Sequence, residues 1–367
     1  MAFNLKPTDD LPLSATNARP GESHSFPTDP TDADANARLA LSADRLHELD
    51  RYAEWDDERT IDALEMALSG LGDVVRLEAD ARFPDRLQQE RPDIVFNVAE
   101  GRGGVSRESY VPTFCEFWDI PYTGSDPLAL GICLDKSRAK EVLSYYGVST
   151  PDFVLARGRA ELNGRPSLPV IVKPVHEGSS KGISQSSVCG RRSQVVEAVD
   201  RIVKTYDQPA LVERFLPGRE FTVAILGNGH EARALPLVEI DHAVLPVHSR
   251  SIYGYEAKWI WDRPEAPLEI FRCPADCDER LGRRVREIAL TGYRVLGCRD
   301  WARVDVRCDA SGEPHILEVN PLPGVLPDPE ANSCFPKAAR AAGLSYADLI
   351  QAVLRAAASR YELAIPA

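Results

Sequence analysis

The chain has 367 residues, 44% of them hydrophobic, and a formal net charge of −13. This length can bury a sizeable core divided over two or three domains, whereas the acidic balance argues against nucleic acid as a general partner, because phosphate backbones bind basic surfaces. No apolar run approaches the roughly 18 residues of a membrane span, and the N-terminus has no secretion signal, so we expect a cytoplasmic protein without membrane partners.

Changes in composition divide the chain into a leader and three units. Residues 1–35 are rich in Pro, Asp, Thr, Ser and Asn, which predicts a disordered leader outside the fold. Alternating helix and strand signals then favour an N-terminal α/β substrate-binding domain over 36–125, a central unit over 126–213 and a C-terminal unit over 214–367. The eight cysteines are scattered, which favours buried free thiols over a zinc site.

In the N-terminal unit, apolar spacing predicts a helix around Arg59–Leu71, a strand around Asp73–Leu77 and a buried strand at Asp93–Val98. This order indicates βαβ organisation with a parallel sheet. The buried strand leads into the loop Ala99–Gly104, which contains Glu100. Open α/β sheets bind ligands at the carboxyl ends of their strands, so this loop is a candidate binding element, with a plain connection as the alternative.

The central unit is predicted to contain a helix at Asp135–Tyr146 and a strand at Pro169–Lys173. Lys173 ends this buried strand and precedes the small-residue loop Gly178–Gly182. Backbone amides of such a loop approach phosphate oxygens closely, so a phosphate site and an ordinary hairpin are the two interpretations. Lys136 stands at a helix start, where amides also favour an anion, with a surface lysine as the alternative.

Strands are predicted near 210–213 and from Glu220 to 225. Glu213 and Glu220 bracket a connection whose apolar residues, Phe215 and Leu216, are suited to the floor of an adenine site, while a carboxylate would accept hydrogen bonds from ribose hydroxyls. Taken singly, each glutamate is better explained as a surface charge.

Two helices are predicted in the C-terminal unit, around Glu279–Leu296 and near Tyr346–Ser359. The stretch 248–266 is irregular. It holds Tyr255-Glu256-Ala257-Lys258-Trp259, whose aromatic and charged residues favour a lid over a site. A loop packed on the surface is the alternative.

Two alternating segments, Arg303–Val306 and Ile316–Asn320, flank a cluster of turn residues and predict a β-hairpin centred near Ser311-Gly312. This register places Asp305 opposite Glu318 and Arg303 opposite Asn320 on one polar face. The other face, which points into a core, carries Val304, Val306, Leu317 and Val319. Two carboxylates and an amide oxygen suit Mg²⁺, which completes its shell with water and nucleotide phosphates; a solvated strand face with polar cross-strand pairs is the alternative.

In their combined order, these motifs resemble the D-alanine–D-alanine ligase family of ATP-grasp enzymes, over about residues 52–358. The matching runs are Ile120–Ser125, Asp135-Lys136 with Lys140, Val172–Pro174 with Glu177–Ser180 and Gly182, Glu213 with Gly218–Val223, Tyr255–Lys258, Arg303 with Asp305, and Leu317–Asn320 with Pro323-Gly324. The resemblance implies an ATP-grasp fold of the α/β (α+β) class, in which ATP lies between the central and C-terminal domains.

The resemblance also implies roles for individual residues. On the nucleotide it implies Lys136, Lys173 and Lys258 at the phosphates and Glu213 and Glu220 at the nucleoside, with Glu177, Ser180, Phe215 and Leu216 beside them. Two Mg²⁺ ions, for which Mn²⁺ is a substitute, would be held by Asp305, Glu318 and Asn320. The catalytic candidates are Arg303 and the amide of Gly324 at the oxyanion, together with Ser179 and Tyr255.

The amino-acid subsites depart from the family pattern. Glu100-Gly101 stands where those ligases typically carry His-Gly, and Trp259 stands where a tyrosine is usual. The loop Val325–Asn332 is longer, so that the comparable serine is Ser333. The stretch 52–58 keeps acidic residues where a glutamate would hold the first substrate's amine, and Glu58 is the candidate.

We therefore expect an ATP-dependent ligase that phosphorylates the carboxylate of one amino acid or small acid and joins it to the amine of a second, with release of ADP and phosphate. The altered subsites favour a specialised dipeptide or natural-product ligase. The alternatives are D-alanine–D-alanine synthesis for peptidoglycan and a catalytically inactive nucleotide-binding homologue. The expected partners are small molecules, and a homodimer is compatible with the sequence.

Overall fold

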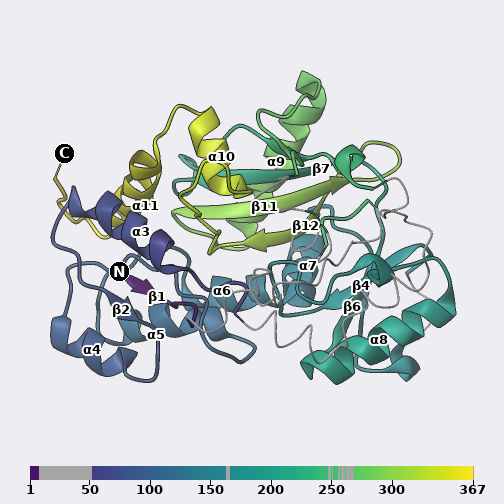
Figure 1. Cartoon of the computed structure of the whole chain (residues 1–367), viewed down its shortest axis with the longest axis horizontal. Coiled ribbons are helices and arrows are strands. Elements are labelled where there is room, and N and C mark those ends of the chain that lie inside the picture. The colour runs from purple at the N-terminus through teal and green to yellow at the C-terminus, as the bar shows by residue number, and fades with distance from the viewer. Residues whose placement is uncertain are drawn as a thin grey trace, which may run out of the picture.

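The computed structural model describes residues 1–7, 52–162, 166–246, 249, 251–254, 257, 261 and 268–366. Three sheets organise these residues. Figure 1 shows the N-terminal unit at the lower left, the central unit at the lower right and the C-terminal unit above both, with helices α6 (Pro127–Leu134) and α7 (Lys136–Tyr145) near the middle.

The N-terminal unit is built on a short parallel sheet, as predicted. Strand β1 (Ala2–Phe3) pairs with β2 (Leu77–Glu78), and isolated bridges join Ala2 to Asn97 and Val95 to Tyr122. The predicted strand at Asp93–Val98 is reduced to such bridges. The helical elements are α3 (Glu58–Ser69), α4 (Phe83–Glu90), the 3₁₀ turn η2 (Arg107–Ser109) and α5 (Tyr110–Phe117).

The predicted disordered leader is wrong for its first residues. Met1, Ala2 and Phe3 are buried, and the ammonium group of Met1 donates to the carbonyl of Val75 at 2.8 Å. These apolar residues add a strand to the sheet because their backbone groups find partners in the neighbouring segments, such as Phe96. A strand of two residues has little effect on the composition of a 35-residue segment, so composition did not reveal it. Residues 8–35 lie outside the described part of the chain.

The central unit is a four-stranded antiparallel sheet in the order β3-β6-β4-β5. The strands are β3 (Phe153–Ala156), β4 (Val170–Pro174), β5 (Val188–Cys189) and β6 (Ala210–Arg214). Helix α8 (Arg192–Tyr206) packs on this sheet through buried Val195, Val199 and Ile202, which recur at helical spacing.

The C-terminal unit contains an antiparallel sheet in the order β10-β9-β7-β11-β12, with β8 paired to β7. Its strands are β7 (Glu220–Leu226), β8 (Arg233–Ala234), β9 (Val238–Ile240), β10 (Phe271–Arg272), β11 (Trp301–Cys308) and β12 (Pro314–Asn320). Its helices are α9 (Glu279–Val295), α10 (Cys334–Ala341) and α11 (Tyr346–Arg360). Further short 3₁₀ turns among the described residues are η3 (Arg159–Glu161), η4 (Gln185–Ser187) and η5 (His242–Val244).

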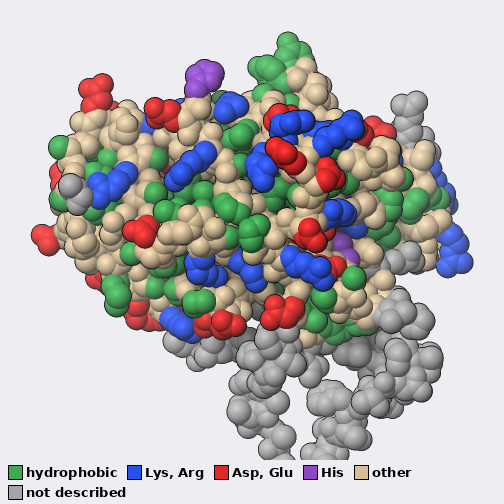
Figure 2. Space-filling model, turned by 90° about the horizontal axis from the view of Figure 1, so that it is seen from above, with side chains coloured by type: hydrophobic (Ala, Val, Ile, Leu, Met, Phe, Trp, Pro, Cys, Tyr) green, Lys and Arg blue, Asp and Glu red, His purple; other side chains and the backbone are tan. Residues whose placement is uncertain are grey.

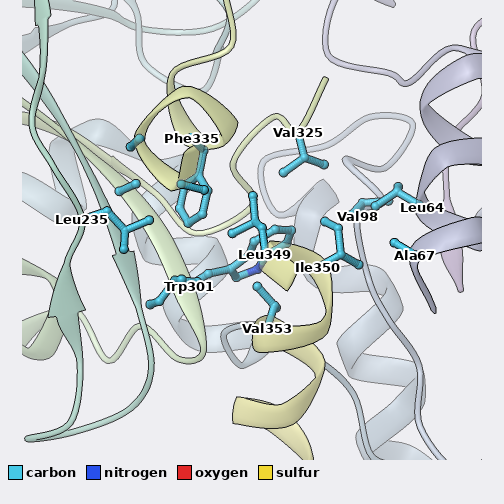
Figure 3. Packing of buried hydrophobic residues seen from close by; sticks show 14 of the residues in the cluster. Leu64, Ala67, Val98, Leu235, Trp301, Val325, Phe335, Leu349, Ile350 and Val353 are labelled. Atoms are coloured by element: carbon cyan, nitrogen blue, oxygen red, sulfur yellow. The ribbon is translucent and has the colours of Figure 1, made fainter. Parts of the chain in front are cut away.

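The two faces of this sheet are covered differently. One face carries Val223, Val304 and Val306 into a core completed by α7 and α9. On the other face, Trp301 is buried beneath α10 and α11, and Figure 3 shows it with Phe335, in a cluster that α3 joins through Leu64 and Ala67. Beyond Trp301 this second face continues as Arg303, Asp305 and Arg307, which no helix covers. The uncovered part lines a cavity.

Acidic and basic side chains are interspersed over the face shown in Figure 2. Within the described ranges, none of the helices combines the length and apolar character needed to cross a membrane.

Candidate functional site

A cavity of about 360 Å³ lies between the central and C-terminal sheets. One wall comes from β4 and β6, the opposite wall from β7, β11 and β12, and the N-terminal unit closes one end with residues such as Glu100 and Glu108. The predicted site residues that line it are Lys136, Lys173, Glu177, Ser179, Ser180, Glu213, Phe215, Leu216, Glu220, Glu100, Arg303, Asp305, Glu318, Asn320, Gly324 and Ser333. Residues far apart in the sequence therefore converge on one cavity.

Glu58 was the wrong choice for the substrate end. It lies in the first turn of α3, pairs with Arg76 at 2.6 Å on the surface, and does not line the cavity. Glu54 lines the cavity instead. Acidic residues at both positions made the two indistinguishable in the sequence, and only the start of α3 at residue 58 separates them.

Three further predicted residues, Tyr255, Lys258 and Trp259, lie outside the described part of the chain. Most of the predicted lid, 248–266, lies outside it as well. Of its described residues, Ile252 and Tyr253 line the cavity, and the Tyr253 carbonyl accepts a hydrogen bond from Ser180 at 2.9 Å.

The hairpin has the predicted register. Asp305 lies opposite Glu318 and Arg303 opposite Asn320. Arg303 donates from Nε and Nη2 to Asp305, each at 2.9 Å, and Asn320 Nδ2 donates to the same carboxylate at 3.2 Å. Lys136 Nζ lies 3.3 Å from the Glu318 carboxylate.

The prediction for Leu317 was wrong. The pairing shifts between Asp305 and Val306, so that Val306 lies opposite Ile316 and one residue of β12 is left over. This β-bulge reverses the alternation, and Ile316 enters the core while Leu317 lines the cavity. A bulge depends on the fit of two strands, and the turn sequence does not reveal it.

The donor set of the hairpin fits Mg²⁺. Asp305, Glu318 and Asn320 supply two carboxylates and an amide on one cavity wall, which are hard oxygen ligands. Across the described ranges no three His, Cys, Asp or Glu side chains converge on one metal position. A divalent ion here would therefore need nucleotide phosphates to complete its shell.

The two carboxylates differ in their electrostatic surroundings. Burial raises the pKa of Asp305, and the charge of Glu318 adds to that effect although Arg303 opposes it. Burial also acts to raise the pKa of Glu318, but the charges of Lys136, Lys173 and Arg303 outweigh it and lower the pKa. Glu318 is thus held as an anion by surrounding cations.

The end of the cavity near β6 and β7 contains two carboxylates with cationic partners, of which Glu213 is buried. Glu213 lies 2.6 Å from Lys173 and 2.9 Å from Lys140, and both lysines are buried. Glu220 lies 2.7 Å from Arg307 and 3.0 Å from His242. Neither glutamate is the surface charge that each resembles when taken singly.

Arg307 lies in this end of the cavity and was missed by the sequence reasoning. Its guanidinium lies 4.8 Å from the centre of the Phe215 ring, and its side chain is 4% exposed. The alternation that placed Arg303 and Asp305 on the polar face places Arg307 there too, so the strand pattern could have found it.

The small-residue loop has the backbone of an anion site. Ser179, Ser180 and Gly182 have φ values of 49°, 61° and 67°. Left-handed residues turn successive N–H groups towards one side, which makes a concavity for negative charge. Lys136 approaches the same loop by donating from Nζ to the carbonyl of Glu177 at 2.5 Å. Its position follows from α7, whose N-cap Asp135 accepts from two backbone amides.

Four side chains join the N-terminal unit to this loop: Glu54, Arg107, Glu177 and Lys181, hereafter the Glu54 cluster. Glu54 accepts from Gly178 N at 2.8 Å, Lys181 Nζ at 2.6 Å and Arg107 Nη2 at 3.1 Å. Lys181 and Arg107 also lie 3.2 Å and 3.6 Å from Glu177. No local pattern in the sequence pairs residues so far apart.

The loop after Gly324 lines the cavity at its two ends, through Val325, Leu326 and Asn332. Its two acidic residues do not line the cavity, and Asp328 pairs with Arg59 at 3.0 Å. Ser333 does line the cavity, and its hydroxyl donates to the carbonyl of Gly324 at 3.3 Å. The negative charges of this loop therefore lie outside the cavity wall that Ser333 joins.

Comparisons with known proteins agree with this geometry. The family model "D-ala D-ala ligase C-terminus" matches residues 139–355. Protein y4sG of Sinorhizobium fredii is 36% identical over 316 residues, which cover 84% of this chain and 90% of that protein. The D-alanine–D-alanine ligase of Bordetella avium is 37% identical over 289 residues, covering 78% of this chain and 81% of the ligase.

Solved structures give the same picture. The D-alanine–D-alanine ligase of Bacillus anthracis, in complex with ATP, superposes with a TM-score of 0.64 at 23% identity, covering 83% of this chain and 94% of that chain. The VanG D-Ala:D-Ser ligase of Enterococcus faecalis superposes with a TM-score of 0.58 at 27% identity, covering 72% and 73%.

Proposed function

This chain belongs to the D-alanine–D-alanine ligase family of ATP-dependent carboxylate–amine ligases, and we propose that it joins two amino acids, or an amino acid and a small acid, through an acylphosphate. The observation that carries the proposal is the convergence of Lys136, Lys173, Arg303, Asp305 and Glu318 on one cavity between two sheets. Phosphoryl transfer needs such concentrated positive charge and oxygen ligands, because its transition state spreads negative charge over the phosphoryl oxygens.

The nucleotide would lie along the cavity from Glu220 to the small-residue loop. The Glu220 carboxylate is suited to ribose hydroxyls, and Phe215 and Leu216 supply an apolar floor for the base. Lys136, Lys173 and the amides of Ser179 and Ser180 would face the phosphates. These roles rest on placement in the cavity and on the chemistry of each group.

Asp305, Glu318 and Asn320 would hold Mg²⁺, which would neutralise negative charge on the transferring phosphoryl group. Arg303 lies beside the same carboxylates, where its guanidinium would stabilise the oxyanion that forms when the amine attacks the activated carboxyl. The amide of Gly324, on the same cavity, is the second donor proposed for that oxyanion. No protein nucleophile is needed.

We propose that the substrate pair differs from two D-alanines. The acceptor end keeps Ser333, so this end supports an amino-acid carboxylate as in the family. The donor end carries Glu100 where the family pattern has a histidine, which changes its charge and hydrogen bonding. The proposed specialisation therefore concerns the donor. A cytoplasmic location and a homodimer remain predictions.

The test is ADP release by the full-length enzyme with ATP and Mg²⁺ over all pairs of a panel of D- and L-amino acids, with products identified by mass. We expect amino-acid-dependent ADP release and a dipeptide product. If none of the tested amino-acid pairs gives ADP release, the ligase proposal is contradicted and a nucleotide-binding homologue is favoured. A kcat/KM for the D-alanine pair above that of every other pair would make the chain a D-alanine–D-alanine ligase.

A further inference from the structure

The donor end of the cavity is lined by more carboxylates than its cations neutralise. Asp56, Glu100 and Glu108 line the cavity from the N-terminal unit. Glu108 is 8% exposed, and within the described ranges no hydrogen bond or ion pair reaches its carboxylate or that of Glu100. A buried carboxylate without a partner is costly, so its presence in a binding cavity indicates a ligand that supplies the partner.

Lys6 lines the cavity close enough to Asp56 for its charge to act on that carboxyl, and three further cations nearby contact other carboxylates. Arg107 and Lys181 both contact Glu54 and Glu177. Lys136 pairs with Glu318. None of these three therefore compensates Glu100 or Glu108 at contact distance, although each lies in the same region of the cavity.

Glu54 is not available for the amine of a substrate. Its Oε1 accepts from Gly178 N, and its Oε2 accepts from Arg107 and Lys181. A donor's α-ammonium group would have to bind one of the unpartnered carboxylates instead. One ammonium group satisfies one of them and leaves the other buried and unpaired.

The pKa shifts of Glu100 and Glu108 agree with a shortage of positive charge beside them. Burial raises the pKa of Glu108 to about 7, against the opposing charges of Arg107, Lys136 and Lys181. Burial raises the pKa of Glu100 well above its ordinary range, and the neighbouring charges of Glu108 and Glu54 add to the rise. A bound cation would favour the charged form of each group.

We infer that the donor substrate is a diamino acid, with a cationic side chain in addition to its α-amine, and that Glu100 and Glu108 bind the two ammonium groups. The inference rests on the proposed ligase function and names the substrate class of its donor site. Glu100 also borders a small space beside Gly324, the proposed oxyanion donor, which places this carboxylate at the reacting end of the donor.

The test compares isosteric ligands that differ by one charge. Binding of ornithine and of norleucine, each as both enantiomers, is measured by calorimetry on the full-length enzyme with a non-hydrolysable ATP analogue and Mg²⁺. We expect one enantiomer of ornithine to bind at least roughly tenfold more tightly than the matching norleucine, about 1.4 kcal/mol. Glu108→Gln should remove that preference, Glu100→Gln should weaken the binding of both ligands because both carry an α-ammonium group, and Glu58→Gln, a surface carboxylate, should change neither.

Equal binding of the two ligands, or no binding of ornithine, overturns the inference without reference to any variant. A preference for ornithine that survives in Glu108→Gln, or unchanged binding of both ligands in Glu100→Gln, overturns the residue assignment on which the inference rests. ADP release is measured separately. Turnover with neutral donors, without a preference for ornithine, contradicts the inference but leaves the ligase function standing. Tight ornithine binding without turnover of any amino-acid pair contradicts the ligase function but not the binding of a diamino acid.

Discussion

Asp305 and Glu318 share the polar face of a strand pair with Arg303, and this placement has a catalytic consequence. The guanidinium bonds directly to Asp305, and Lys136 lies next to Glu318. Each carboxylate thus has a cation on one side and the open cavity on the other. The carboxylates are positioned to hold a divalent ion against phosphate oxygens, which would bring further negative charge.

We predict that Asp305→Asn and Glu318→Gln each lower turnover at least ~100-fold with the fold intact, because an amide cannot replace the charge of an anionic metal ligand. ADP release with the best substrate pair and saturating Mg²⁺ gives the rate, and circular dichroism gives the fold. Glu313→Gln changes a carboxylate that is 57% exposed beside the turn of the same hairpin and should leave the rate unchanged. Near wild-type rates in the first two variants would contradict the metal assignment.

Glu108 gives a prediction about pH. Burial raises its folded-state pKa to about 7, among Arg107, Lys136, Lys181, Glu54 and Glu100. The folded chain therefore binds this proton more tightly than the unfolded chain, and the associated stability is present at low pH and lost as pH rises to about 7. The amide of Glu108→Gln resembles the protonated acid and does not titrate, so this variant keeps its free energy of unfolding over that pH range.

The free energy of unfolding of Glu108→Gln, relative to wild type, should thus rise between about pH 5 and about pH 8. Urea unfolding of both proteins at several pH values measures this difference. Glu58→Gln, at the surface, should show no such trend. A difference for Glu108→Gln that stays constant with pH would show that the carboxyl does not titrate in this window.

At the scale of elements, the bulge in the β11–β12 pair decides which side chains reach the cavity. The hairpin residues before it alternate as expected, with Val304 and Val319 in the core. The bulge turns Ile316 into the core and Leu317 towards the cavity. Re-aiming side chains in this way is a common use of bulges near active sites.

Strand β1 is the second element with a testable role. Phe3 is 6% exposed and packs in the cluster that includes Ile61 and Leu64. Phe3→Ala should lower the free energy of unfolding by about 3–5 kcal/mol, as large-to-small changes in a core do. Phe117→Ala, at a side chain that is 77% exposed, should change it by less than about 0.5 kcal/mol. Equal effects in urea unfolding would place β1 outside the fold.

At the scale of the whole molecule, the Glu54 cluster connects the N-terminal unit to the small-residue loop of the central unit. The main cavity and a second one of about 480 Å³ share Glu54, Trp55 and Glu177 in their walls, so these residues separate them. The charges are buried, with side chains of Glu54 and Arg107 each 9% exposed. Removing one member leaves uncompensated charge inside the protein.

We predict that Glu54→Gln costs about 3–5 kcal/mol of stability, because it leaves Lys181 and Arg107 poorly compensated. In a double-mutant cycle with Lys181→Met, the coupling energy should be about 1–3 kcal/mol, whereas a cycle with the exposed Lys204→Met should give none beyond about 0.5 kcal/mol. Urea unfolding of the single and double variants supplies the four free energies. Additive effects of Glu54→Gln and Lys181→Met would mean that the pair does not couple.

Local patterns in the sequence were sufficient for several of the longer elements and for the pairing at the start of the hairpin, whereas the helices α4, α5, α6, α8 and α10 were not predicted. Alternation along 303–306 and 316–320 and the turn residues between them predicted the pairing of Asp305 with Glu318, because strand geometry follows a period of two residues. Helical spacing predicted α3, α7, α9 and α11 to within a few residues of their observed bounds. The order of the motifs indicated the family.

The tertiary structure alone decided which acidic residues of the N-terminal unit reach the cavity, and what each one contacts there. Glu54 and Glu58 are the same residue type four positions apart, and the sequence does not distinguish them. In the structure, Glu58 lies in the first turn of α3 and pairs with Arg76. Glu54 accepts hydrogen bonds from Arg107 and Lys181. The burial of Glu108 and its lack of a partner among the described residues depend on how the N-terminal, central and C-terminal units pack around the cavity. Periodicity describes one element at a time, so charge balance in a cavity built from several elements is set only when they pack together.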